Sequence, residues 1–158
     1  MCWSQNVSLI LTGLGIVTTL YSYKYINILW AITIFYFTVM QIIHYLGYLV
    51  IDDCNNNLNK LLSYSNYIHI SFQPAIYLLG IYGLFTTYNI INKNQLISLK
   101  YYIYLALVAG CFYLLRIIPI YHSLKKEGCL WCGNTCSFTG KQHINFSLPL
   151  RLEPYYFT

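Results

Sequence analysis

Four long apolar runs divide the chain, and no other feature of the sequence constrains the fold as strongly. Each run is bounded by charged or polar residues, and together they cover residues 7–23, 26–51, 67–88 and 101–121. The hydrocarbon core of a bilayer, roughly 30 Å thick, is crossed by about 17 to 25 helical residues. The pattern therefore predicts an all-α fold, a polytopic membrane helical bundle of about four transmembrane helices within residues 1–121.

The balance of charged and apolar residues supports a membrane protein. Charged residues make up 8% of the chain and hydrophobic residues 58%, whereas soluble domains carry about 25% charged residues. Such a chain cannot cover a water-facing surface. It opens without a basic segment or a small-residue cleavage site, so we expect a retained first helix rather than a removable signal peptide.

The positive charges are scattered singly, which bears on the partners of the protein. Nine Lys and Arg residues against four acids give a net charge of +5, but they form no basic stripe. We therefore expect no nucleic-acid partner. The expected partner is the lipid bilayer, together with a second copy of the chain or a separate helical partner.

Residues 122–158 follow the last apolar run and form a cysteine-rich tail outside the membrane. The segment CLWCGNTCSFTGKQH, from Cys129 to His143, has the spacing Cys-x2-Cys-x3-Cys-x6-His. Four crossings place the N-terminus, the 52–66 loop and this tail on one membrane face. An even number of crossings thus places five of the six cysteines on this face. Only Cys111 falls within a helix, where we expect a small buried residue. The candidate metal or disulfide residues on the shared face are Cys2, Cys54, Cys129, Cys132, Cys136 and His143.

The orientation of the protein in the membrane decides whether these thiols bind a metal or form disulfides. On a cytoplasmic face, clustered cysteines indicate a metal, and the Cys/His set suits tetrahedral zinc; on an oxidising face they indicate disulfides. Free or acylated thiols are a third alternative. Five Lys and Arg residues on the shared face, against Lys24, Lys93 and Lys100 on the other, weakly favour a cytoplasmic shared face. Zinc therefore stays open as a cofactor.

A few polar residues within or beside the spans form a second candidate site. His69 and Gln73 lie four residues apart in the third run and share a helix face, and Asp53 ends the second run. We expect Pro74 within the opening turns of the third helix. His44 is interpreted as a hydrogen-bonded core histidine.

Four short motifs carry a resemblance to a known family. They are MCWS at the start, IDDCNNNLN at 51–59, YIHISFQPA at 67–75 and HINFSLPLR at 143–151. Together they resemble a family of uncharacterised multi-pass membrane proteins from bacteria, eukaryotes and large DNA viruses, known only as a domain of unknown function. The resemblance implies that these residues match the family pattern, none with an established role: Cys2, Trp3, Ser4, Asp53, Cys54, His69, Gln73, Pro74, His143 and Pro149.

Two departures from the family pattern affect the interpretation. The family has a carboxylate after the methionine of the second helix, where this chain has Met40 and Gln41. Family members continue through about three more helices, whereas this chain stops at Thr158. The resemblance thus implies a shortened member, in which a site completed by those helices would be incomplete.

The sequence favours a non-enzymatic membrane protein with a structural or interaction role, and it assigns no catalytic residue. One alternative is a membrane-embedded, metal-dependent hydrolase similar to the ceramidase and adiponectin-receptor superfamily, with zinc among Ser4, Asp53, His69 and His143. Another is a small transporter, for which only Gln41 and His44 on the second helix qualify. The chain is rich in Asn, Ile, Lys and Tyr, which suggests an A+T-rich genome. Such a genome would fit a viral source and a virion or host membrane.

Overall fold

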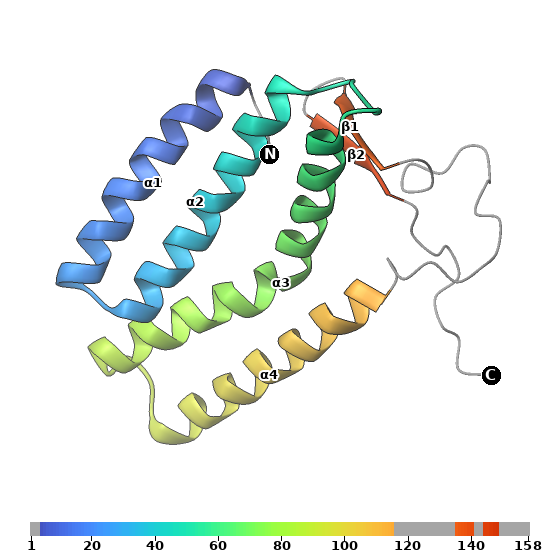
Figure 1. Cartoon of the computed structure of the whole chain (residues 1–158). Helices are drawn as coiled ribbons and strands as arrows, with labels where there is room; N and C mark the ends of the chain where they lie inside the picture. Colours follow the sequence, from blue (N-terminus) through green and yellow to red (C-terminus); the bar gives the residue numbers. More distant parts are fainter. Residues whose placement is uncertain (1–3, 116–134, 141–143, 149–158) are drawn as a thin grey trace, which may run out of the picture.

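The computed structural model describes residues 4–115, 135–140 and 144–148 of the chain. Four long helices and one strand pair make up this part of the molecule (Figure 1). The elements are α1 (Gln5–Tyr25), α2 (Ile28–Leu49), α3 (Asn57–Tyr88), α4 (Lys93–Leu115), β1 (Cys136–Thr139) and β2 (Ile144–Ser147). All four helices are long and apolar enough to cross a membrane, so the prediction of four such helices is confirmed.

Short polar side chains determine where the helices begin and end. Ser4 accepts a hydrogen bond from the Val7 amide, and Asn27 and Asn56 cap α2 and α3 in the same manner. Such caps satisfy amide groups that have no partner inside the helix. At the other end of α3, Asn89 adopts a left-handed conformation, with φ of 50°, which asparagine tolerates better than most residues.

The helices form an open row rather than a closed bundle. Within the described residues, the extensive helix contacts join α1 to α2, α2 to α3 and α3 to α4 (Figure 1). Side chains at these contacts are small: a Cβ atom on Gly80 would press into Thr33, and one on Gly110 would press into the backbone of Ser71. Close approach of this kind is typical of membrane helices.

The third helix begins at Asn57 rather than near Tyr67, so most of the segment expected to be a polar loop is helical. Two of its buried polar side chains, Asn59 and Ser63, bind Ser137 of the strand pair, as described below. Pro74 consequently lies in the interior of α3 and not in its opening turns. Proline lacks the amide hydrogen that would bond to the preceding turn, and Figure 1 shows α3 bending between its two halves.

The fourth helix also begins earlier than expected, at Lys93 instead of Tyr101. The Asn92 side chain accepts a hydrogen bond from the Gln95 amide, and the Gln95 side chain accepts one from the Asn92 amide. This reciprocal cap starts the helix within the segment expected to be a connector. The expected end of the span at Tyr121 lies outside the described residues.

The tail contains β structure, which the all-α prediction did not include. Strands β1 and β2 are antiparallel, with Cys136 opposite Ser147 and Thr139 opposite Ile144. They lie beside the end of α2 and the start of α3, and α1 begins at this same end of the molecule (Figure 1). We call the strand pair and the loop of residues 50–56 the cap, and the end with the α1–α2 and α3–α4 turns the opposite end.

The distribution of side chains is inverted relative to a water-soluble protein. Large apolar residues point outward, including Leu14, Val17 and Leu20 of α1, each about 60% exposed (59%, 66% and 64%). The buried positions in the helices hold small or polar residues instead, such as Ala31 and Thr38. A soluble monomer rarely exposes so large a continuous apolar surface.

We expect Gly110→Val to destabilise the α3–α4 contact by about 1–3 kcal/mol, because its Cβ would lie 2.7 Å from the Ser71 carbonyl oxygen. Gly13→Val is the matched control, since no atom lies within 4 Å of a Cβ built there, and its effect should stay within about 0.5 kcal/mol. Helix content during unfolding in detergent micelles measures both. Equal effects of the two variants would contradict the close contact.

Candidate functional site

A row of polar residues follows one face of α3 from the cap into the apolar part of the molecule. Asn59, Ser63, Asn66 and His69 are spaced by four, three and three residues, which places them on one helix face. All four are buried, with exposures of 0%, 0%, 4% and 5%. The first two contact the cap, and the last two contact α2.

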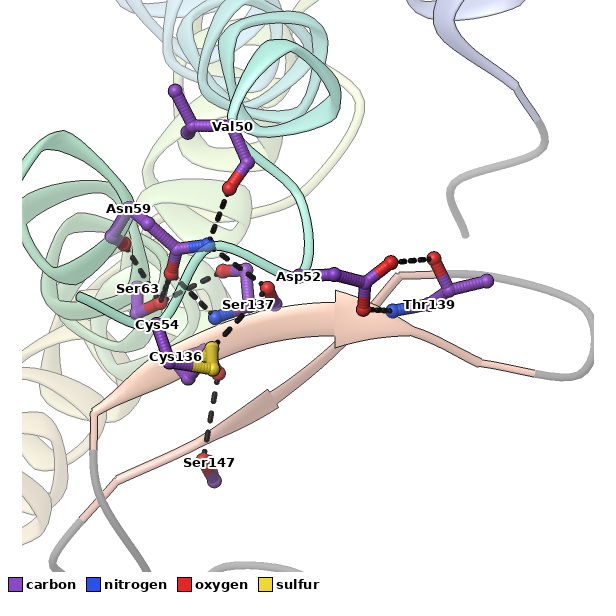
Figure 2. Close-up of a disulfide and its surroundings, with 9 residues drawn as sticks. All are labelled: Val50, Asp52, Cys54, Asn59, Ser63, Cys136, Ser137, Thr139 and Ser147. Carbon is purple, nitrogen blue, oxygen red and sulfur yellow. Dashed lines mark hydrogen bonds between the residues drawn. A yellow bond between two sulfur atoms is a disulfide. The ribbon is translucent and has the colours of Figure 1, made fainter. Parts of the chain in front are cut away.

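The Asn59 side chain joins three segments of the chain (Figure 2). Its Nδ2 donates to the carbonyl oxygens of Val50, at 2.7 Å, and Ser137, at 2.9 Å. Its Oδ1 accepts from the Ser137 amide at 2.6 Å. The amide of Asn59 thus pairs with both backbone groups of one residue of β1, as a neighbouring strand would.

Two hydroxyl groups complete this buried network. The Ser63 and Ser137 Oγ atoms are 2.7 Å apart, and Ser63 also donates to the Asn59 carbonyl oxygen at 2.9 Å. Buried polar groups without partners cost about 1–3 kcal/mol each. Because the hairpin satisfies these groups, residues of α3 that are too polar for an apolar core are stable there.

A disulfide closes the cap from the other side of β1. Cys54 of the loop is bonded to Cys136, the first residue of β1, with their Cα atoms 4.9 Å apart (Figure 2). The two cysteines are 82 residues apart in sequence. For this pair the structure shows the disulfide alternative. A cross-link that closes a loop of this length stabilises the folded state by about 4 kcal/mol in the chain-entropy treatment.

Asp52 binds the far end of β1. It adopts φ of 66°, in the left-handed region, and its carboxylate accepts hydrogen bonds from the Thr139 amide, at 2.8 Å, and the Thr139 hydroxyl. Its own amide donates to the Ser137 carbonyl oxygen at 3.1 Å. The two hydrogen bonds from Thr139 hold the pKa of the exposed Asp52 carboxyl below its usual value.

Apolar contacts seat the hairpin on α3 and α4. Leu148, fully buried, packs with Tyr67, and Tyr64, Leu114 and Phe146 surround them. The Tyr67 hydroxyl donates to the Tyr113 carbonyl oxygen of α4 at 2.6 Å. The hairpin is thereby attached to α3 through a cluster that also includes Leu114 of α4.

The deeper half of the polar row lies between α2 and α3. The His69 ring stacks on Tyr36, with centroids 3.7 Å apart, and the Tyr36 hydroxyl donates to the His69 carbonyl oxygen. Asn66 is hydrogen-bonded to His44, which is 3% exposed, in agreement with the interpretation of His44 as a bonded core residue. Within the described part of the chain, His69 Nε2 and Asn66 Oδ1 have no hydrogen-bond partner.

The residues predicted as sites are only partly brought together. Cys54 and Cys136 form the disulfide, whereas Cys2, Cys129, Cys132 and His143 lie outside the described residues. In the described ranges, no three His, Cys, Asp or Glu residues form a group that could hold a metal. Cys111 is exposed on α4, not buried as expected, because α4 contacts only one neighbouring helix extensively.

The candidate polar site of Asp53, His69 and Gln73 is spread along the molecule. Asp53 lies in the loop and accepts a hydrogen bond from Asn56 at 3.3 Å. His69 is twelve residues beyond the start of α3, about 18 Å along its axis. Gln73 is half-buried one turn further. The polar residues that do converge are Asn59, Ser63 and Ser137. Asn59 and Ser63 have helical spacing but belong to a segment interpreted as loop, and Ser137 belongs to the tail.

The described residues form a helical protein with four long apolar helices, a polar row between α2 and α3, and a disulfide-bonded cap. Residues 6–155 match a family described as a family of unknown function (DUF5765), and the chain belongs to that family. The resemblance to a family of unknown function is thereby confirmed. Comparison with curated proteins and with solved structures gave no match.

We expect Asn59→Leu to loosen β1 from α3, because the Ser137 amide would lose its partner and the carbonyl oxygens of Val50 and Ser137 would each lose one of two donors. The loss should amount to about 1–3 kcal/mol, seen as roughly 10- to 100-fold faster hydrogen exchange of the Ser137 amide. Asn57→Leu is the control, since Asn57 is exposed at the start of α3. Unchanged exchange in Asn59→Leu would contradict the role of this amide.

The attachment of Thr139 to Asp52 should depend on pH. A pKa lowered in the folded state means that the contribution of Asp52 is complete above about pH 4 and is lost as the pH falls through the folded pKa. The protection of the Thr139 amide, measured as its exchange rate relative to the intrinsic rate at the same pH, should therefore fall in acid. Asp52→Asn keeps an acceptor oxygen and should remove this pH dependence, whereas Asp53→Asn should retain it.

Proposed function

We propose that the protein is a multi-pass integral membrane protein with four crossings, whose role is structural or interaction-directed rather than catalytic. The observation that carries this proposal is the inverted distribution of side chains, with large apolar residues outside and small or polar residues inside. A bilayer would cover the outward apolar surface and remove its cost in water. An α-helix makes its backbone hydrogen bonds within itself, as a membrane requires.

We further propose that the cap faces an oxidising compartment. Disulfides persist in extracellular, lumenal and periplasmic spaces and are rare in the reducing cytosol. Lys24, Lys93 and Lys100 then lie on the cytoplasmic side, where positive residues near helix ends are usually found. The count of Lys and Arg residues outside the apolar runs favoured the reverse orientation, but by a small margin, and Lys141 and Arg151 are far from the helix ends. The chemistry of Cys54 and Cys136 is the stronger constraint.

In this orientation, the cap is a rigid support for the remaining residues of the tail. Asn59, Asp52 and the disulfide hold β1 at three points. The segment of Cys129 and Cys132 joins α4 to β1 and is therefore tethered at both ends. Zinc at Cys2, Cys129, Cys132 and His143 stays a prediction. We infer that the tail is presented to a partner outside the cytoplasm.

The hydrolase and transporter alternatives gain no comparable support. Two residues that a zinc hydrolase would need are engaged locally: Ser4 caps α1, and Asp53 binds Asn56. The transporter alternative requires a continuous polar path. The polar row ends at His69, and further along the contact between α2 and α3 the Thr33 hydroxyl donates to the Ile76 carbonyl oxygen at 3.0 Å.

Orientation is tested with two tagged variants in sealed vesicles. One carries an epitope after Gly140 in the hairpin turn, and the other carries it between Ile90 and Ile91 in the α3–α4 connector. We expect the tags on opposite sides, with the hairpin tag in the oxidising compartment. Both tags on one side would exclude this topology. Extraction of the protein by alkaline carbonate would exclude membrane insertion itself.

The same vesicles test the disulfide. Cys54→Ser and Cys136→Ser should each give the same loss of stability, about 4 kcal/mol, and the same protease-sensitive tail. Cys111→Ser is the control, because Cys111 is a free, exposed thiol on α4. Unequal effects of the first two variants would show that the cysteines act separately.

A further inference from the structure

The opposite end of the molecule carries positive charge without compensation. Lys24 at the end of α1 and Lys93 and Lys100 in α4 are all exposed. Asp52 and Asp53 are the only carboxylates among the described residues, and both belong to the cap. Three ammonium groups therefore share this end with no described acidic side chain.

A shallow groove lies at this end between α3 and α4. Its volume is about 390 Å³. Apolar side chains of Phe85, Ile91 and Leu99 form one part of its lining, and polar side chains of Asn94, Gln95 and Ser98 form another. A groove lined by both apolar and polar side chains fits a molecule with both kinds of group.

Two of the lysines lie beside this groove. Lys93 precedes Asn94 in the chain, and Lys100 follows Leu99. The Lys100 ammonium lies 5.4 Å from the ring centroid of Tyr82, a residue of α3 one turn before the lining residue Phe85. Both lysines are thus next in the chain to lining residues, at the end expected to lie at a membrane surface.

We propose that the α3–α4 groove binds an anionic phospholipid from the leaflet at this end, with its phosphate near Lys93 and Lys100 and its upper acyl chain against Phe85 and Leu99. This inference rests on the proposed membrane insertion. The proposed orientation supports it, because the cytoplasmic leaflet contains the anionic lipids and basic residues near that surface attract them. A soluble anion would leave the apolar lining unused.

The test compares lipid binding in nanodiscs of phosphatidylcholine with a minor fraction of phosphatidylglycerol. Native mass spectrometry of the released protein should show phosphatidylglycerol retained preferentially. The double variant Lys93→Gln, Lys100→Gln should lose this preference by about fivefold for each lysine. Lys60→Gln is the matched control, since Lys60 lies at the start of α3 near the cap, and it should keep the preference.

A second variant separates the groove from diffuse charge. Ser98→Phe would fill the groove while leaving all three lysines in place, and it should reduce retained phosphatidylglycerol as strongly as the double variant. Full preference in Ser98→Phe, or no preference in the unaltered chain, would overturn the proposal. Failure of the chain to enter nanodiscs would instead overturn the proposed membrane insertion.

Discussion

The amide side chain of Asn59 is the interaction on which the arrangement of the cap depends. It reaches Val50, the residue that follows α2, and pairs with both backbone groups of Ser137, although it belongs to α3. The disulfide limits how far β1 can move. The hydroxyl contact between Ser63 and Ser137 and the hydrogen bonds from Thr139 to Asp52 are specific to these side chains, and they support the same register. In an apolar setting, the buried amide of Asn59 would be costly without these backbone partners.

The row of helices follows from what lies between them. Where glycine meets threonine or a backbone carbonyl, as at Gly80 and Gly110, neighbouring helices approach closely. Where Thr33 and Tyr36 of α2 donate to carbonyl oxygens of α3, hydrogen bonds join the helices. These bonds flank Pro74, whose missing amide hydrogen leaves the preceding turn of α3 short of one donor. The bend of α3 therefore occurs where α2 supplies hydroxyl groups from outside the helix.

Hydropathy and parity could predict the four helices and that Cys54 and Cys136 lie at the same end of the molecule. They could not predict the pairing, because parity assigns a side of the membrane and not a distance. The first turns of α3 were missed for a related reason: Asn59, Ser63 and Asn66 look like loop residues unless their partners are known. Ser137, the main partner, is more than seventy residues away and lies in a strand too short for a clear alternating pattern.

The two ends of the described molecule differ in chemistry, and each difference supports the other. The cap combines a disulfide, two carboxylates and backbone groups held by polar side chains. The opposite end has three lysines, exposed tyrosines such as Tyr25 and Tyr88, and no described carboxylate. An oxidising environment on one side and an anionic lipid surface on the other would favour this one orientation. Reversing this orientation would place the disulfide in a reducing compartment and move the lysines away from the anionic leaflet. The disulfide and the lysines therefore favour the same orientation.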